Sequence, residues 1–326
     1  MQILSGVEQY NNEYWNYAQK RIKKNSDKKY LNGFYQFLLS DGQRSFSGAY
    51  AYLGHVIGFV NYENIVDPKT INLDNFSEYL NVAYQGRSSS HQICVFSALK
   101  EFSKYLIANG YVEKDYMQFF KRPTPVETVE MLEKREKAYM TTDEIDQYIS
   151  NVRNSDKREE WKARDMAIVL ILLNSGIRCA ALQKLDLDNV NFDDNSITVL
   201  EKRKKSKKVY LTEKTMGTLS EWLEYRNELL VDNNECALFI SNHKKRITRK
   251  TIYNIVQEYG VVIQDKNITP HKMRGTYGTQ LYNKTKDLYF VQEAMGHSNP
   301  KTTEIYIRGQ KHDVAKKACE LIGDLF

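Results

Sequence analysis

The sequence predicts a mainly helical protein of two domains, the second of which also contains a small antiparallel sheet. Three observations predict this fold class: the length of the chain, the helical recurrence of its apolar residues, and two short β-branched runs on either side of a basic turn. With 326 residues the chain is long enough for two domains that each bury a core without disulfides or metals.

Residues 1–120 are predicted to form a helical bundle. From about residue 7 to 110 apolar residues recur at helical spacing in four or five segments, such as KYLNGFYQFLLS and HQICVFSALKEFSKYLIANG. Breaks of polar, loop-like composition separate these segments at residues 24–28, 40–43, 67–69 and 86–90.

A charged connection is predicted at residues 121–139. In FKRPTPVETVEMLEKREKAY, two prolines that follow a basic pair interrupt the helical pattern and favour an extended chain. The second domain, residues 140–326, then opens at Thr141 with Glu144 three positions later, which is a helix-start signature.

The second domain is predicted to combine helices with one hairpin. The apolar helix RDMAIVLILLNSG ends at Gly176, and the β-branched runs 197–200 and 209–212 flank the basic turn EKRKKSKK. Further helical segments follow, in EWLEYRNELL, RKTIYNIVQEYG, PHKMRGTYGTQLYNK and KDLYFVQEAMGH.

The charge balance is mildly basic, with 47 Lys and Arg against 41 Asp and Glu and a net charge of +6. This excess fits nucleic-acid binding if the basic residues cluster, and they do so in KRKKSKK and HKKRITRK. A solvated charged surface is the alternative for such runs. The predicted DNA-phosphate contacts are Arg203, Lys204, Lys205, Lys207, Lys208, Lys244, Lys245, Arg246, Arg249 and Lys250.

The four cysteines are widely spaced and form no CxxC pair, so neither a zinc site nor a disulfide framework is indicated. We expect buried thiols in a reducing cytosol. The sequence has no apolar stretch of membrane-spanning length and no signal pattern at its N-terminus, so we expect a soluble, cytoplasmic protein.

His271 and Arg274 are predicted to share one face of a helix at its N-terminus. Thr269 suits the N-cap and Pro270 the first helical position, which starts the helix at His271. The helix dipole adds only about 0.3–1 kcal/mol for an anion, so the side chains would provide most of a phosphate site. A surface pair with structural salt bridges is the alternative.

His297 and Tyr306 lie close together in the sequence near its end. Asp287 can cap a helix that Gly296 ends, which leaves His297 at the turn. A new helix is predicted from Asn299-Pro300, so that Tyr306 can face the same cavity as that turn. Because the chain has 23 tyrosines, a packing role for Tyr306 is the alternative.

Arg178 and Lys202 complete the candidate site. Arg178 follows a tight turn in apolar surroundings, where an arginine needs an anion that Asp186, Asp188 or a DNA phosphate would supply. Lys202 opens the basic turn, where it is either part of a solvated run or a proton donor to a departing alkoxide. Guanidinium groups, proton donors and a hydroxyl together suit attack on a phosphodiester.

The ordered set resembles the signature of the tyrosine recombinases, or phage integrase family: Arg, Lys, His-x-x-Arg, His or Trp, and Tyr. The matching segments are SGIRCAALQKLDLDNV, ITVLEKRKKSKKVYLT, TPHKMRGTYGTQL and MGHSNPKTTEIYI, of which the last is the most specific. The resemblance covers the second domain residue by residue. It covers the first only in architecture, as a SAM-like core-binding domain in the simple two-domain arrangement of Xer-like and Cre-like recombinases.

The resemblance implies site-specific recombination of double-stranded DNA through a 3′-phosphotyrosyl intermediate and a Holliday junction, without cofactor or metal. Tyr306 would be the nucleophile and Lys202 the acid for the leaving oxygen. Arg178, Arg274, His271 and His297 would act on the phosphate and the transferred protons. A homotetramer on two specific sites is the implied assembly, with accessory proteins as a further partner class.

Two positions depart from the family pattern and keep other functions open. Ala181 stands where an acidic residue is common, and Gly275 where a histidine is common. The alternatives are a catalytically inactive DNA-binding module, an enzyme that relaxes DNA as type IB topoisomerases do, and a hydrolase using Cys179 with His271.

Overall fold

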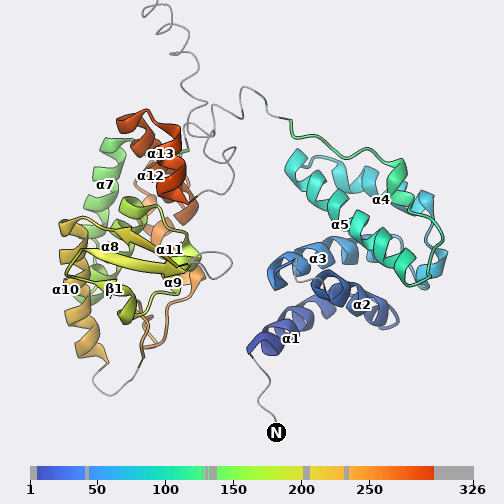
Figure 1. The fold of residues 1–326 in the computed structure, drawn as a ribbon, viewed down its shortest axis with the longest axis horizontal. Helices are drawn as coiled ribbons and strands as arrows, with labels where there is room; N and C mark the ends of the chain where they lie inside the picture. The colour runs from blue at the N-terminus through green and yellow to red at the C-terminus, as the bar shows by residue number, and fades with distance from the viewer. Residues whose placement is uncertain are drawn as a thin grey trace, which may run out of the picture. The chain divides into compact units, whose positions relative to one another are not determined.

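The computed structural model describes residues 6–40, 44–126, 128, 131, 138–200, 206–230 and 235–296, with side chains described from residue 13 onward. The chain divides into two compact units, Met1–Glu127 and Thr128–Phe326, which are described separately below (Figure 1). The division falls inside the predicted connection of residues 121–139.

The first unit is a helical bundle, as predicted. Its core is aromatic: Phe34, Phe59 and Phe102 are fully buried, and Phe34 meets Phe102 edge to face with ring centroids 5.1 Å apart. Side-chain caps begin several of the helices, as where the Ser45 hydroxyl accepts from the amide of Gly48 at 3.2 Å. In order, its described elements are α1 (Gly6–Gln19), α2 (Asp27–Ser40), α3 (Phe46–Tyr62), η1 (Pro68–Thr70), α4 (Leu73–Tyr84), α5 (Ser89–Ala108) and η2 (Tyr116–Phe119).

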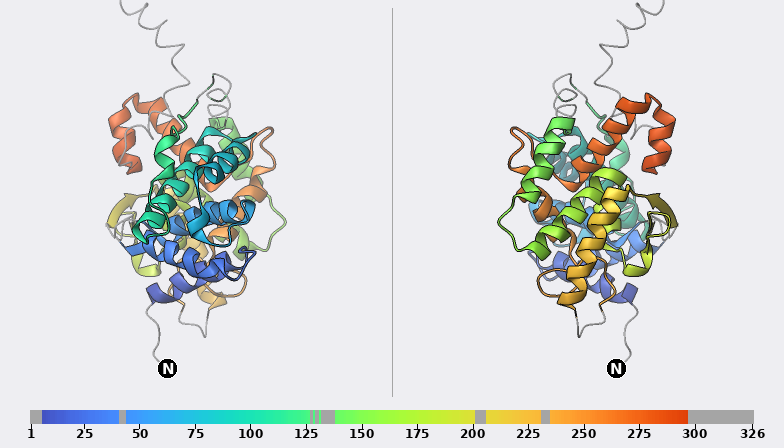
Figure 2. Two further views of the ribbon diagram at one scale, coloured as in Figure 1. Left: turned by 90° about the vertical axis from the view of Figure 1, so that its right-hand side faces the viewer. Right: turned by 90° about the vertical axis from the view of Figure 1, so that its left-hand side faces the viewer.

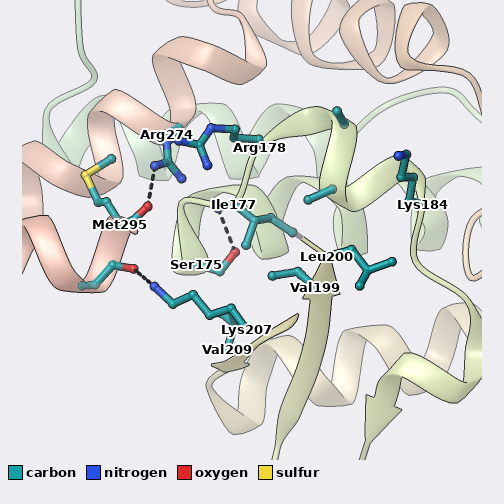
Figure 3. Close-up of a pocket in the computed structure, with 13 residues that line it drawn as sticks. Ser175, Ile177, Arg178, Lys184, Val199, Leu200, Lys207, Val209, Arg274 and Met295 are labelled. Carbon is teal, nitrogen blue, oxygen red and sulfur yellow. Dashed lines mark hydrogen bonds between the residues drawn. The ribbon is translucent and has the colours of Figure 1, made fainter. Parts of the chain in front are cut away.

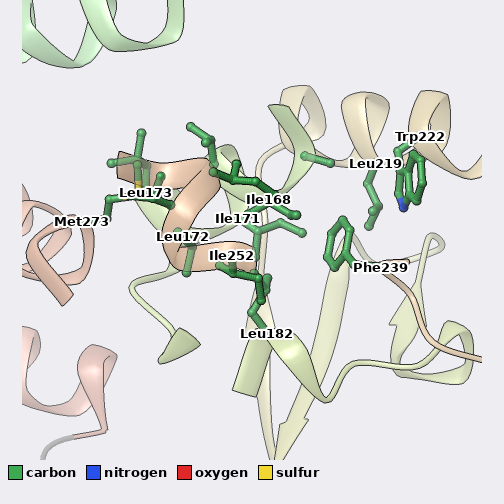
Figure 4. Close-up of a cluster of buried hydrophobic side chains, with 14 of the residues drawn as sticks. Ile168, Ile171, Leu172, Leu173, Leu182, Leu219, Trp222, Phe239, Ile252 and Met273 are labelled. Carbon is green, nitrogen blue, oxygen red and sulfur yellow. The ribbon is translucent and has the colours of Figure 1, made fainter. Parts of the chain in front are cut away.

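The second unit is built around one buried helix, α8. Its apolar run MAIVLILL is covered on all sides, because α8 packs against α7, α10 and α12. Large side chains from neighbouring elements, such as Trp222 and Phe239, complete this core (Figure 4). Its described helices are α7 (Thr142–Arg153), α8 (Glu159–Ser175), α9 (Cys179–Gln183), η3 (Leu187–Asn189), α10 (Glu213–Leu229), α11 (Arg249–Gly260), α12 (Pro270–Thr285) and α13 (Leu288–Met295).

The predicted helix boundaries around the candidate site are confirmed. Thr141 and Glu144 form a capping box, in which the Glu144 carboxylate accepts from the Thr141 amide at 2.7 Å. Thr269 caps α12 and Asp287 caps α13, and these two helices pack against each other (Figure 2). Gly296 ends α13 in the left-handed region, with φ of 61°.

The antiparallel sheet contains the predicted hairpin, but the second strand was placed too late. Strands β1 (Val190–Asn191), β2 (Ser196–Leu200) and β3 (Ser206–Tyr210) pair in the order β1-β2-β3. Lys207 and Lys208 therefore lie in β3 and not in the turn. Lys207 pairs with Val199 of β2, and its long aliphatic stem is compatible with this half-buried strand position. The two-residue strand β1 was not predicted.

The expectation of buried thiols is wrong for two of the three cysteines that the structure describes. Cys94 and Cys236 are exposed, and Cys179 is partly buried. In the described part of the chain, no helix combines the length and the apolar character needed to cross a membrane.

Candidate active site

A cavity of about 210 Å³ opens where the ends of α8 and α13 meet α9, α12 and the β2–β3 hairpin. Four basic side chains line it, and no acidic residue is among the described residues of its wall. A pocket with apolar walls and charges of one sign concentrates the field and favours an anion. The four basic residues are Arg178, Lys184, Lys207 and Arg274.

Arg274 is buried at the centre of this wall and is 5% exposed. Its Nη1 donates to the carbonyl of Gly176, just after α8. Its Nη2 donates to the carbonyl of Met295, the last residue of α13, at a distance of 2.5 Å (Figure 3). The negative ends of two helix dipoles therefore face one guanidinium group, which stabilises its charge in a buried position. Gly176 can turn the chain here because its φ of 59° suits glycine.

Arg178 lies beside Arg274 and reaches the same cavity from the N-cap position of α9 (Figure 3). Arg178 is itself exposed, and it directly follows the buried residues 175–177, in line with the apolar neighbourhood expected from the sequence. Asp186, named above as one structural partner for it, instead forms an ion pair with Arg246. Two neighbouring guanidinium groups repel each other, so an oxyanion that accepts from both would be favoured between them.

His271 lies one helical turn before Arg274 on α12, at the position predicted from the sequence. It is exposed, and it is not among the described residues that line the cavity. Residues three apart share a helix face, so both side chains project from the same side of α12.

Three of the predicted catalytic residues, Lys202, His297 and Tyr306, lie outside the described residues, as do Arg203, Lys204 and Lys205. The elements that lead to them do reach the cavity. Leu200, the last residue of β2, and Met295, the last of α13, both line it.

The remaining predicted DNA contacts differ in their surroundings. Lys244, Lys245, Arg249 and Lys250 are exposed, whereas Lys208 pairs with Asp194. Arg246 is engaged inside the protein, since it also donates to the carbonyls of Gln183 at 3.3 Å and Leu185 at 3.1 Å. These bonds hold the end of α9, and a DNA contact by Arg246 stays a prediction.

Two basic residues of the cavity were not recognised as such from the sequence. Lys184 follows α9, and no sequence signal separates it from an ordinary surface lysine. Lys207 was assigned to the turn, although its alternation with Val209 could have placed both on one face of a strand.

Position 275 is glycine because another side chain occupies the space beside it. A Cβ added to Gly275 would collide with the ring of Tyr139, and the chain around Tyr139 is fastened to α12. The Met140 amide donates to the Thr276 hydroxyl at 3.1 Å, and the Gln280 amide group donates to the Met140 carbonyl at 3.2 Å. Tyr139 thus fills the space beside α12 that a side chain at position 275 would enter.

Gly275→Ala is expected to destabilise the protein by about 1–3 kcal/mol, because the new methyl group overpacks against Tyr139. Thermal unfolding midpoints would measure this. Gly217→Ala is the matched control, since a Cβ at this position in α10 meets nothing within 4 Å. It should raise stability by about 0.5–1 kcal/mol through helix propensity. Equal midpoints for the two variants would contradict the collision.

Cys179 is not prepared to act as a nucleophile. Burial raises the pKa of its thiol, which opposes formation of the thiolate that a cysteine hydrolase requires. The structure therefore removes the support for a hydrolase that uses Cys179 with His271.

Comparison with known proteins identifies the family of this chain. The model of the phage integrase family matches residues 138–312. The chain is 28% identical over 233 residues to the tyrosine recombinase XerD of Staphylococcus epidermidis, covering 71% of this chain and 76% of that one. It is 30% identical over 223 residues to the tyrosine recombinase XerC of Vibrio cholerae, covering 68% of both.

Solved structures share the fold. The crystal structure of the XerH site-specific recombinase bound to the palindromic difH substrate superposes with a TM-score of 0.69 at 19% identity, over 95% of this chain and 94% of that one. The Tn1549 transposon integrase in complex with transposon right end DNA gives 0.66 at 17% identity, over 90% and 99%. The family model and the sequence relatives together show that this chain belongs to the phage integrase family, the tyrosine recombinases.

Proposed function

We propose that this chain recombines DNA at specific sites by cutting and rejoining strands, with Tyr306 as the nucleophile. The observation that supports the proposal is the cavity, whose described charged residues are all basic. It lies where the chain leaves β2 toward Lys202 and leaves α13 toward His297 and Tyr306. The membership of this chain in the phage integrase family supports the same activity.

In the proposed reaction, the Tyr306 hydroxyl oxygen attacks the scissile phosphorus and the bond to the 5′ oxygen breaks. The tyrosine loses its proton, and the leaving 5′ oxygen gains one. The phosphotyrosyl ester keeps the energy of the phosphodiester. The 5′-hydroxyl of another strand can therefore attack it and reseal the DNA, and two such rounds proceed through a Holliday junction.

The predicted catalytic residues have distinct tasks in this proposal. Arg178 and Arg274 stabilise the extra negative charge on the phosphate oxygens in the transition state. Lys202 protonates the leaving oxygen, and His271 assists proton transfer at the tyrosine. His297 donates a hydrogen bond to the phosphate.

The DNA would be held through its phosphates by exposed basic residues such as Lys244, Lys245, Arg249 and Lys250, which makes binding steeply dependent on salt. We propose a tetramer on two recombination sites, acting on DNA in the cytoplasm. The tail KKACELIGDLF has the amphipathic pattern of a helix that could dock on a neighbouring subunit or on its own domain.

A plasmid carrying two copies of the target site, taken from the DNA that flanks the gene, tests the activity. Incubation with the protein should yield two smaller circles or an inverted segment, according to the orientation of the sites. Relaxed plasmid without exchange would indicate a topoisomerase-like enzyme. Bound but unchanged plasmid, without a covalent complex on nicked sites, would indicate an inactive DNA-binding module.

A further inference from the structure

Lys207 points from β3 into the cavity and not toward solvent. Residues alternate along this strand, so that Lys207 and Val209 are half-buried while Lys208 between them is exposed. The Lys207 Nζ donates to two backbone carbonyls at the end of α13, those of Glu293 at 3.0 Å and Ala294 at 2.9 Å. Figure 3 shows Lys207 reaching toward the helix end that carries Met295.

These two bonds complete a cationic cap on α13. A helix leaves its last four carbonyls without partners inside the helix, and positive charge there is favourable. In α13 the carbonyls of Glu293 and Ala294 accept from Lys207, and the carbonyl of Met295 accepts from Arg274. The last three residues of the helix are thus attached to β3 and α12 through two charged side chains.

The position of this cap gives it a role in the site. Gly296 follows directly, and the chain then continues to His297 and Tyr306. Strand β3 begins at Ser206, directly after the segment that contains Lys202. Lys207 therefore links the two parts of the chain that carry the nucleophile and the proposed acid.

We propose that Lys207 is a positioning residue, which fixes the end of α13 relative to the hairpin and so aligns Tyr306 for attack. This inference rests on the proposed function. It differs from a phosphate contact, because two of the three donors of the ammonium group are used on backbone carbonyls. It also differs from proton donation, which belongs to Lys202 in the proposed reaction.

The test compares Lys207→Met, which keeps the length of the side chain without its charge, with Lys214→Met. The control removes the same charge from an exposed lysine of α10, outside the cavity wall and outside the predicted DNA contacts. Nicked suicide substrate at saturating concentration would measure the rate of covalent complex formation. Titration at several salt concentrations would measure affinity and its salt dependence.

Lys207→Met is expected to form the adduct about 100-fold more slowly, the scale of a displacement of about 1 Å in a site, with affinity and salt dependence nearly unchanged. Lys207→Arg should recover much of the rate, because it can donate to the same carbonyls. Lys214→Met should cleave at the wild-type rate.

Three outcomes would overturn the inference while leaving the proposed function intact, provided that the wild type forms the adduct. One is a wild-type cleavage rate in Lys207→Met. Another is a weaker affinity whose salt slope falls by about one unit, which marks an ordinary phosphate contact. The third is full rescue by a 5′-phosphorothiolate substrate, whose sulfur leaves without a proton, because rescue would make Lys207 the acid. No adduct in the wild type would instead contradict the proposed function.

Discussion

Tyr306→Phe is expected to abolish the covalent protein–DNA complex while leaving DNA affinity nearly unchanged. The substitution removes only the hydroxyl that would attack the phosphorus, and it leaves the aromatic ring and the basic cavity in place. Nicked DNA carrying the target site, incubated with each protein and resolved under denaturing conditions, would measure the adduct. Binding under native conditions would measure affinity.

Tyr289→Phe provides the matched control for this experiment. Tyr289 is 82% exposed on α13, and its substitution removes the same atom from a tyrosine outside the cavity wall. It should form the adduct as the wild type does. An adduct that survives in Tyr306→Phe would show that another residue is the nucleophile.

Arg274→Ala is expected to lose both stability and cleavage. It leaves the carbonyls of Gly176 and Met295 without the guanidinium group in a buried place, at about 1–3 kcal/mol for each unsatisfied group. It also removes a charge that would stabilise the transition state. The thermal unfolding midpoint and the single-turnover cleavage rate at saturating DNA would measure the two effects separately.

Arg178→Ala separates chemistry from stability. Arg178 carries the same charge into the same cavity but is exposed, so its loss should leave the unfolding midpoint nearly unchanged. Cleavage should still slow by about 10²–10³-fold, the effect of losing one preorganised donor to a developing charge. Equal losses of rate and affinity would mark Arg178 as an ordinary phosphate contact, and unchanged stability in Arg274→Ala would contradict its structural role.

The parts of the fold that were predictable from the sequence depend on local chemistry. Thr141, Thr269 and Asp287 each cap a helix through their own side chains, and Gly176 and Gly296 each end one in the left-handed region. Such signals involve residues within one turn of each other. These signals therefore allowed Arg178, His271 and Arg274 to be assigned to the correct elements from the sequence.

The features that were missed depend on partners far away in the chain. The start of β3 is determined by its pairing with β2. Lysine is not favoured in β-strands, so lysines in the sequence do not indicate one. The bonds from Lys207 to α13 join residues 86 and 87 positions apart, and those from Arg274 join helices that only the tertiary fold brings together.

The contact between Tyr139 and Gly275 restricts the order in which these two positions can change during evolution. A larger residue at 275 collides while the tyrosine ring is present, whereas a smaller residue at 139 only vacates space beside α12. A lineage that gains a side chain at 275 is therefore expected to lose the ring at 139 first. Relatives with histidine after the second arginine should accordingly carry a small residue at the position of Tyr139.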